Sequence, residues 1–171
     1  LTALQNMGAK VTYHAGDVAD VERMTEIIQT VKKSTPNLTG VIHSAGVGNT
    51  GTPISEREID SMKKTLQPKV NGSIILEELT REMDRGFFVS FSSIATIVPS
   101  SGGLDYACAN GFEDSYAEAV RSAENNIKVI NWSDWKETGL AHRKRLSRSD
   151  EEVGSREEKV KGLSNTEDLS S

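Results

Sequence analysis

The residues best suited to chemistry lie between positions 90 and 110, in the run SFSSIATIVPSSGGLDYACAN. Tyr106 and Asn110 are four positions apart, so on a helix their side chains share one face. Ser93 closes an apolar run thirteen residues before Tyr106. Open parallel α/β sheets usually bind ligands at the carboxyl ends of their strands. The spacing therefore predicts a crevice in which hydroxyl and amide groups can hydrogen-bond a ligand.

Alternating helix and strand patterns position these residues. Helical spacing of apolar residues appears over 20–34, over 55–83 with a kink or new helix start at Pro68, and over 105–123, while residues 1–8 predict a helix end closed by Gly8. Short β-branched or apolar runs predict strands at 10–16, 40–46, 86–93 and 128–135. The order predicts a parallel α/β sheet, with the third of these strands buried on both faces.

Composition excludes several other classes of protein. The chain has 171 residues, enough for one domain, with a net charge of −5 that argues against a nucleic-acid partner. A single cysteine, Cys108, excludes an internal disulfide and fits a reducing compartment. The three histidines are widely separated, so we expect no metal site. No apolar run is long enough to predict a membrane span.

Five blocks resemble the ketoreductase domain of modular polyketide synthases, a branch of the short-chain dehydrogenase/reductases: VIHSAGV, QPKVNG, FFVSFSSIA, DYACANGFEDSYA and INWSDWKETG. Most of the superfamily carries Tyr-x-x-x-Lys. This branch has Tyr-x-x-x-Asn, with the lysine moved to the preceding helix. The sequence matches the branch, with Tyr106, Asn110 and Lys69, which stands 24 residues before Ser93. The resemblance implies a Rossmann-like doubly wound sheet.

The resemblance also implies a role for each of these four residues. Tyr106 would donate a proton to the carbonyl oxygen of a ketone as hydride arrives, and Ser93 would give that oxygen a second hydrogen bond. An ammonium at Lys69 would stabilise the phenolate, and Asn110 would help to orient the lysine. Each residue also has a purely structural interpretation, such as a solvated lysine in a first helical turn or a serine that merely ends a strand.

The implied cofactor is NADPH. Asp17 and Val18 resemble the pair that contacts adenine, and Ser44, Ala45 and Gly46 resemble the turn that lines the cofactor's ribose, next to Lys69 and Tyr106. The motif GVGNTG at 46–51 has the spacing of a pyrophosphate loop. We do not assign it that role, because Thr52 and Pro53 follow where a helix should start. The family's glycine-rich loop and first two strands are expected upstream of residue 1.

The resemblance sets the expected organisation and partners. Residues 1–140 correspond to the C-terminal part of the ketoreductase domain, and the charged residues 141–171 to a lid and domain end or linker. The partners would be an acyl carrier protein bearing a phosphopantetheine-bound β-ketoacyl chain and the other domains of a cytoplasmic synthase. One alternative is an inactive domain retained as a scaffold. A free-standing dehydrogenase is disfavoured because it would carry Lys at position 110.

A strand at 10–15 without upstream strands has no neighbour, and the strand at 40–44 becomes a free edge. We therefore predict that these 171 residues alone are poorly stable and do not bind NADPH. Fluorescence titration of the isolated chain with the cofactor measures this directly, and micromolar affinity would contradict it.

Overall fold

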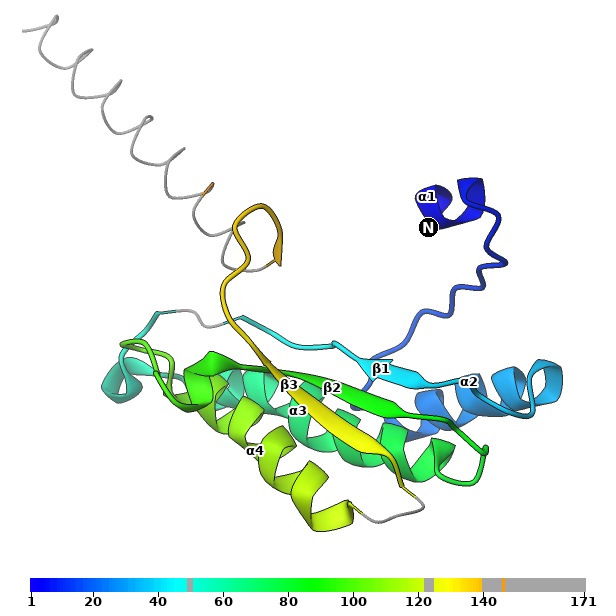
Figure 1. The fold of residues 1–171 in the computed structure, drawn as a ribbon. Helices are drawn as coiled ribbons and strands as arrows, with labels where there is room; N and C mark the ends of the chain where they lie inside the picture. The colour runs from blue at the N-terminus through cyan, green and yellow to red at the C-terminus, as the bar shows by residue number, and fades with distance from the viewer. Residues whose placement is uncertain (49–50, 122–124, 140–145, 147–171) are drawn as a thin grey trace, which may run out of the picture. The chain divides into compact units, whose positions relative to one another are not determined.

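A computed structural model describes residues 1–48, 51–121, 125–139 and 146 (Figure 1). The chain divides into two compact units, Leu1–Trp132 and Ser133–Ser171. The elements described below belong to the first unit. The expected boundary at residue 140 and, apart from Leu146, the expected lid lie outside the described residues.

Three parallel strands form the sheet, in the order β1-β2-β3. They are β1 (Val41–His43), β2 (Phe88–Ser93) and β3 (Ile127–Trp132). The register pairs His43 with Ser90 and Ser93 with Trp132. The helices are α1 (Thr2–Asn6), α2 (Val21–Ser34), α3 (Ile59–Thr80) and α4 (Leu104–Val120), with short 3₁₀ turns η1 (Ile54–Glu56) and η2 (Ile94–Thr96). The predicted parallel α/β fold is confirmed.

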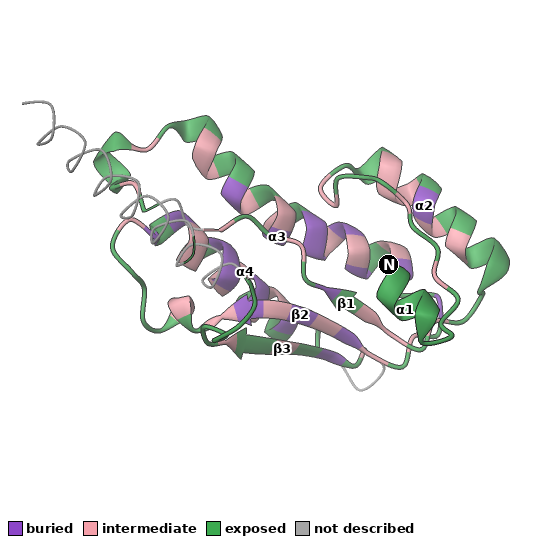
Figure 2. Cartoon of the chain, turned by 90° about the horizontal axis from the view of Figure 1, so that it is seen from above, coloured by how far each residue is buried: buried purple, intermediate pink, exposed green. Residues whose placement is uncertain are grey.

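Helices α3 and α4 cover one face of this sheet (Figure 1). Phe88, Ala117 and Ile127 form the buried core between the layers, and in Figure 2 the buried residues gather on α3, α4 and the central strand. The opposite face is open, because Ile42 of β1 is 60% exposed and Ile130 of β3 is 38% exposed. The expectation that β2 is buried on both faces is therefore wrong for this chain: its residues alternate between buried and half-buried.

Two predicted elements differ from the structure. Residues 10–15 form no strand. β1 is the edge of the sheet, and no other described strand lies beside it to extend the sheet toward residues 10–15. The helix expected over 55–83 is α3, which runs unbroken through Pro68. Pro68 lacks only one N–H, and packing of α3 on α2 and α4 holds the helix together on both sides of it.

The helix ends agree with the sequence. The Asp20 side chain accepts a hydrogen bond from the Arg23 backbone N–H at 3.0 Å, as an N-cap does. Gly8 follows α1 with φ +87°, the left-handed conformation that glycine tolerates best.

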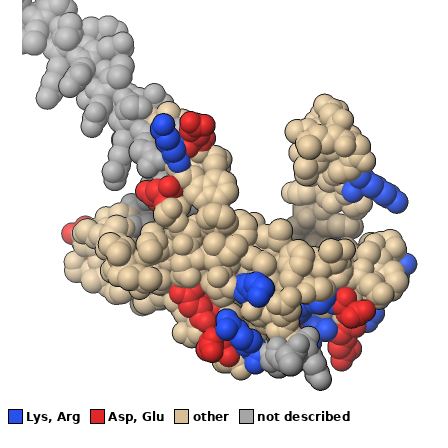
Figure 3. Space-filling model, in the orientation of Figure 1, with Lys and Arg blue, Asp and Glu red and all other residues tan. Residues whose placement is uncertain are grey.

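Charged side chains of both signs are scattered over the face drawn in Figure 3. None of the described helices has the length and apolar composition needed to cross a bilayer.

A buried carboxylate ties α3 to the amino ends of two strands. Glu77 of α3 accepts hydrogen bonds from Arg85, which precedes β2, at 2.8 Å, and from Asn125, which precedes β3, at 2.9 Å. It is also bonded to Arg81 at 3.0 Å. Burial alone would raise the pKa of Glu77, but these hydrogen bonds and the Arg81 charge lower it from 4.5 to about 2.

Glu77→Gln removes this charge while leaving Arg85 buried, and we expect it to destabilise the fold by about 3 kcal/mol. Because the pKa is depressed in the folded state, the stabilisation is complete above about pH 4.5 and is lost as pH falls through about 2. Thermal unfolding over this pH range checks both points. Glu78→Gln, on the exposed side of the same helix, is the matched control and should unfold as the parent does.

Candidate active site

Lys69 is buried in the middle of α3, with only 5% of its surface exposed. Its ammonium donates a hydrogen bond to the Phe91 backbone carbonyl of β2 at 2.6 Å and another to the Glu113 carboxylate of α4 at 2.7 Å. The interpretation of Lys69 as a solvated first-turn lysine is therefore wrong. A buried ammonium is tolerated only when such partners compensate its lost hydration.

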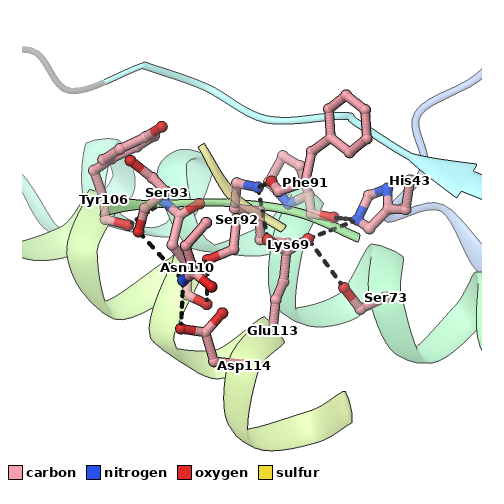
Figure 4. Close-up of polar contacts among 12 residues, drawn as sticks. His43, Lys69, Ser73, Phe91, Ser92, Ser93, Tyr106, Asn110, Glu113 and Asp114 are labelled. Atoms are coloured by element: carbon pink, nitrogen blue, oxygen red, sulfur yellow. Dashed lines mark hydrogen bonds and ion pairs between the residues drawn. The ribbon is translucent and has the colours of Figure 1, made fainter. Parts of the chain in front are cut away.

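Glu113 is the residue that sequence reasoning missed. It is 1% exposed, and its second oxygen lies 3.5 Å from both the Ser73 hydroxyl and the His43 ring nitrogen Nε2. A signal was present, since Glu113 stands three residues after Asn110 and seven after Tyr106. Those intervals place it on the helix face that carries the predicted site. Figure 4 shows the carboxylate between Lys69 and Ser73.

Burial and charge set the protonation states of this cluster. Burial, followed by the charge of Lys69, lowers the pKa of His43 to about 4, against a smaller opposing effect of its bond to the Pro68 carbonyl. The imidazole is therefore neutral at pH 7. Burial raises the pKa of Glu113 to about 7, although the Lys69 charge and hydrogen bond oppose the rise.

Ser93 ends β2 and caps the following turn. Its hydroxyl oxygen accepts a hydrogen bond from the Ala95 backbone N–H at 3.2 Å. A hydroxyl that accepts in this way still has its own O–H to donate. The structural role of ending the strand and the expected role of binding a ligand oxygen are thus compatible.

Asn131 of β3 holds the neighbourhood of Ser93 in place. Its side-chain amide donates to Asp114 of α4 at 2.9 Å and lies 3.3 Å from the hydroxyls of Ser92 and Thr96. One side chain therefore links two strands, the turn after β2 and helix α4. Sequence reasoning did not single out Asn131, because its partners are remote in the chain.

Tyr106 lies in the first turns of α4 and is half-buried. No described residue hydrogen-bonds its hydroxyl, which leaves the phenol available to a ligand. In Figure 4, Tyr106 and Ser93 lie at one end of a row of polar side chains, with Lys69 in the middle and His43 at the other end.

Asn110 is fully buried one turn below Tyr106. Its amide donates to the Tyr106 backbone carbonyl at 2.7 Å, and its own backbone carbonyl accepts from the Ser92 hydroxyl at 3.3 Å. These bonds fix the first turn of α4 against β2. The hydrogen bonds of the Lys69 ammonium go to Phe91 and Glu113 rather than to Asn110. Cys108, between Tyr106 and Asn110, is exposed.

The turn after β1 reaches Lys69. A Cβ added at Gly46 would lie 3.1 Å from the Lys69 Cε and 3.7 Å from its Nζ, so the backbone of this turn passes directly over the ammonium. Ser44 and Gly46 are exposed, and Ala45 is half-buried. The structure thus brings the predicted ribose turn and the predicted lysine together.

Asp17 and Val18, the residues predicted to contact adenine, make contacts that a purely structural role also explains. The Asp17 carboxylate accepts a hydrogen bond from the Ala19 backbone N–H at 2.9 Å and so caps a turn. The Val18 side chain packs against α3, 2.8 Å from the position of a Cβ added at Gly72. Val18 therefore lies near β1, since His43 also borders Gly72.

GVGNTG does not form a pyrophosphate loop at the start of a helix. Its last glycine, Gly51, is followed by the short turn η1, and α3 begins only at Ile59. Asn49 and Thr50 lie outside the described residues. In the described part of the chain, no three histidine, cysteine or acidic side chains are grouped as metal ligands.

A cavity of about 320 Å³ opens beside the start of α4. The Arg57 guanidinium crosses its wall, donating to the Gly102 carbonyl at 2.7 Å and to the Asp105 carboxylate at 3.1 Å. Asp105 directly precedes Tyr106. The ion pair therefore fixes the loop that leads into the tyrosine's helix and leaves space for a ligand next to it.

The chain is similar in sequence to proteins of a known family. The family model described as KR domain matches residues 1–137. The chain is 37% identical over 153 residues to polyketide synthase PksN of Bacillus subtilis and 36% identical over 155 residues to pikromycin polyketide synthase component PikAII of Streptomyces venezuelae, in each case over 85% of the chain. The chain belongs to the KR domain family.

Solved ketoreductases share the fold. An A1-type ketoreductase is 33% identical with a TM-score of 0.75, and a ketoreductase domain from the bacillaene assembly line is 29% identical with a TM-score of 0.74; each match covers 86% of this KR chain. The chain spans 32% and 38% of those structures, and 3% and 4% of the two synthases. The fold is thus the Rossmann-like fold of short-chain dehydrogenase/reductases.

Gly46→Ala tests the contact between the ribose turn and Lys69. The added methyl meets a lysine that cannot retreat, because its ammonium is bound at 2.6 and 2.7 Å on the other side. Gly46 does not adopt the left-handed conformation, so backbone strain adds nothing. Overpacking of this kind costs about 1–3 kcal/mol, and we expect the Kd for NADPH of the full-length protein to rise about tenfold or more.

Gly111→Ala is the matched control, because a Cβ there meets nothing within 4 Å. Equal NADPH affinities for the two variants, measured by fluorescence titration, would show that the Gly46 turn does not contribute to the cofactor site.

Proposed function

We propose that this KR chain carries the catalytic residues of an NADPH-dependent reductase that converts a β-ketoacyl thioester on an acyl carrier protein to the β-hydroxyacyl thioester. The observation that carries the proposal is the placement of Lys69: a buried cation fixed between β2 and α4 and covered by the Gly46 turn. A lysine used only for solubility would not be buried at this cost.

The residues present fit the nicotinamide half of the cofactor. The Ser44–Gly46 turn is accessible, carries no side chain over Lys69, and lies beside a cation that can bind ribose hydroxyls. Asp17 and Val18 would lie toward the adenine. When bound, NADPH supplies the hydride.

The chain's own residues would complete the reduction. Hydride addition to the carbonyl carbon places a pair of electrons on the oxygen, which must take up a proton. The free hydroxyl of Tyr106 would donate that proton, its O–H bond breaking as the alcohol O–H forms. The Ser93 O–H would hydrogen-bond the same oxygen while charge develops there, and the Lys69 ammonium would stabilise the phenolate left behind.

The partners follow from the relatives. PksN and PikAII are named as polyketide synthases, of which the chain matches a small part. We infer that this chain likewise works beside other synthase domains in the cytoplasm and receives its substrate on the phosphopantetheine arm of a carrier protein. The cavity walled by Arg57 and Asp105, at the start of the helix that carries Tyr106, would admit part of the acyl chain.

One observation favours the scaffold alternative: the Glu113 carboxylate neutralises Lys69 inside the fold. If the chain is only a scaffold, the full-length protein reduces no ketone. If it is a reductase, the full-length protein consumes NADPH in the presence of a β-ketoacyl thioester and forms the alcohol. Product analysis by mass spectrometry separates the two.

Tyr106→Phe removes the phenol O–H and preserves the ring. In the full-length protein that carries this chain we expect kcat for a soluble β-ketoacyl thioester to fall by about 10²-fold or more, since general acid catalysis contributes roughly that much. The Kd for NADPH should stay within about twofold. Tyr13→Phe, at a tyrosine that is 71% exposed, is the control and should match the parent. Undiminished turnover in Tyr106→Phe would remove Tyr106 as the acid.

A further inference from the structure

The cluster behind Lys69 has a single carboxylate. Of the three N–H bonds of the ammonium, one goes to Glu113 at 2.7 Å and one to the Phe91 carbonyl at 2.6 Å. Asp114, the next acidic residue on α4, is bonded to Asn131 instead. Among the described residues, Glu113 is therefore the ionic partner that fixes where the Lys69 charge lies.

Residues from two other elements, α3 and β1, lie against the second oxygen of this carboxylate. The Ser73 hydroxyl of α3 donates to its second oxygen at 3.5 Å, and His43 of β1 approaches the same oxygen at 3.5 Å. The His43 nitrogen Nε2 also lies 3.1 Å from the Pro68 carbonyl, which can only accept. Nε2 must therefore carry the hydrogen that this carbonyl accepts, and the Glu113 oxygen lies 3.5 Å from the same nitrogen.

Accordingly, and resting on the function proposed above, we propose that Glu113 is a positioning residue for the reduction: its carboxylate, held by His43 and Ser73, keeps the Lys69 ammonium against the Phe91 carbonyl and directed into the crevice that Tyr106 and Ser93 line. The lysine then needs no reorganisation when negative charge develops on the phenol.

The charges around Glu113 give this role a pH dependence. The groups that face it are His43 from β1, Lys69 and Ser73 from α3, and Asp114 beside it on α4, together with the carbonyl of Phe91 on β2. Because the pKa of Glu113 is about 7, the carboxylate is ionised above neutral pH and protonated below it. Protonation of Glu113 removes the negative charge that holds the ammonium and leaves only the Phe91 carbonyl, so we expect kcat to fall on the acidic side of about pH 7.

Glu113→Gln in the full-length protein tests the proposal through activity. We expect kcat to fall about tenfold or more with the KM for the thioester little changed, and the acidic limb near pH 7 to disappear. Glu113→Asp, which keeps the charge on a shorter side chain, should restore part of kcat and the limb. Glu118→Gln, at an exposed position on the same helix, should behave as the parent. A Glu113→Gln kcat within twofold of the parent, or an unchanged pH profile, would overturn the proposal.

A second measurement does not require activity. Reductive methylation followed by peptide mass spectrometry reports how available the Lys69 amine is, with the exposed Lys63 as internal reference. We expect Glu113→Gln to raise the labelling rate of Lys69 at pH 8 at least fivefold relative to Lys63, and an unchanged rate would overturn the pairing. If the unmutated protein shows no turnover but Glu113→Gln still raises the labelling rate of Lys69, only the proposed function is contradicted.

Ser73→Ala keeps the test decisive if Glu113→Gln does not fold. It removes one hydrogen bond to the carboxylate and leaves the ion pair in place, so we expect the acidic midpoint of kcat to move to higher pH, because the Ser73 bond favours the ionised carboxylate. A midpoint that does not move would contradict the proposal.

Discussion

A lysine ammonium placed inside a packed α/β layer must be surrounded by acceptors, because the hydration that it loses is worth several kcal/mol. Lys69 is such a lysine, and the elements packed around it supply the acceptors that it needs. The Phe91 carbonyl of β2 and the Glu113 carboxylate of α4 supply the acceptors. The two elements that flank α3 are thereby held against the same atom. The position of the cation and the packing of the layer are parts of one arrangement.

Parallel topology brings the remaining parts to that cation. All strand ends of the same sense lie at one edge of a parallel sheet, so the turn after β1 and the serine at the end of β2 meet there. Helix α4 begins at the same edge and adds Tyr106 from its first turn. The hydrogen bonds of Asn131 and Asn110 then fix the turn after β2 and the start of that helix.

At the opposite edge of the sheet, a second buried carboxylate is also held by charged donors. Glu77 is also a fully buried carboxylate, yet it faces two arginines and an asparagine, and its pKa falls to about 2. Glu113 faces one ammonium, and burial prevails, so its pKa rises to about 7. The hydrogen bonds and charge around Glu77 outweigh the effect of burial on its pKa, whereas burial outweighs the effect of Lys69 on the pKa of Glu113. One glutamate is therefore permanently ionised, while the other titrates where biological pH varies.

The sequence by itself determined the three strands that form, the three long helices, and the spacing of Ser93, Tyr106, Asn110 and Lys69 that marks the family. These features depend on local periodicity and on intervals that can be counted. Only the tertiary structure decided that residues 10–15 form no strand and that one face of β2 stays open, since both depend on which neighbours are present. It alone showed that Lys69 is buried and that Glu113 and His43 lie behind it. Their contacts join residues 22, 44 and 70 positions apart in the chain. Pairing over such distances is set by packing, which no local pattern encodes.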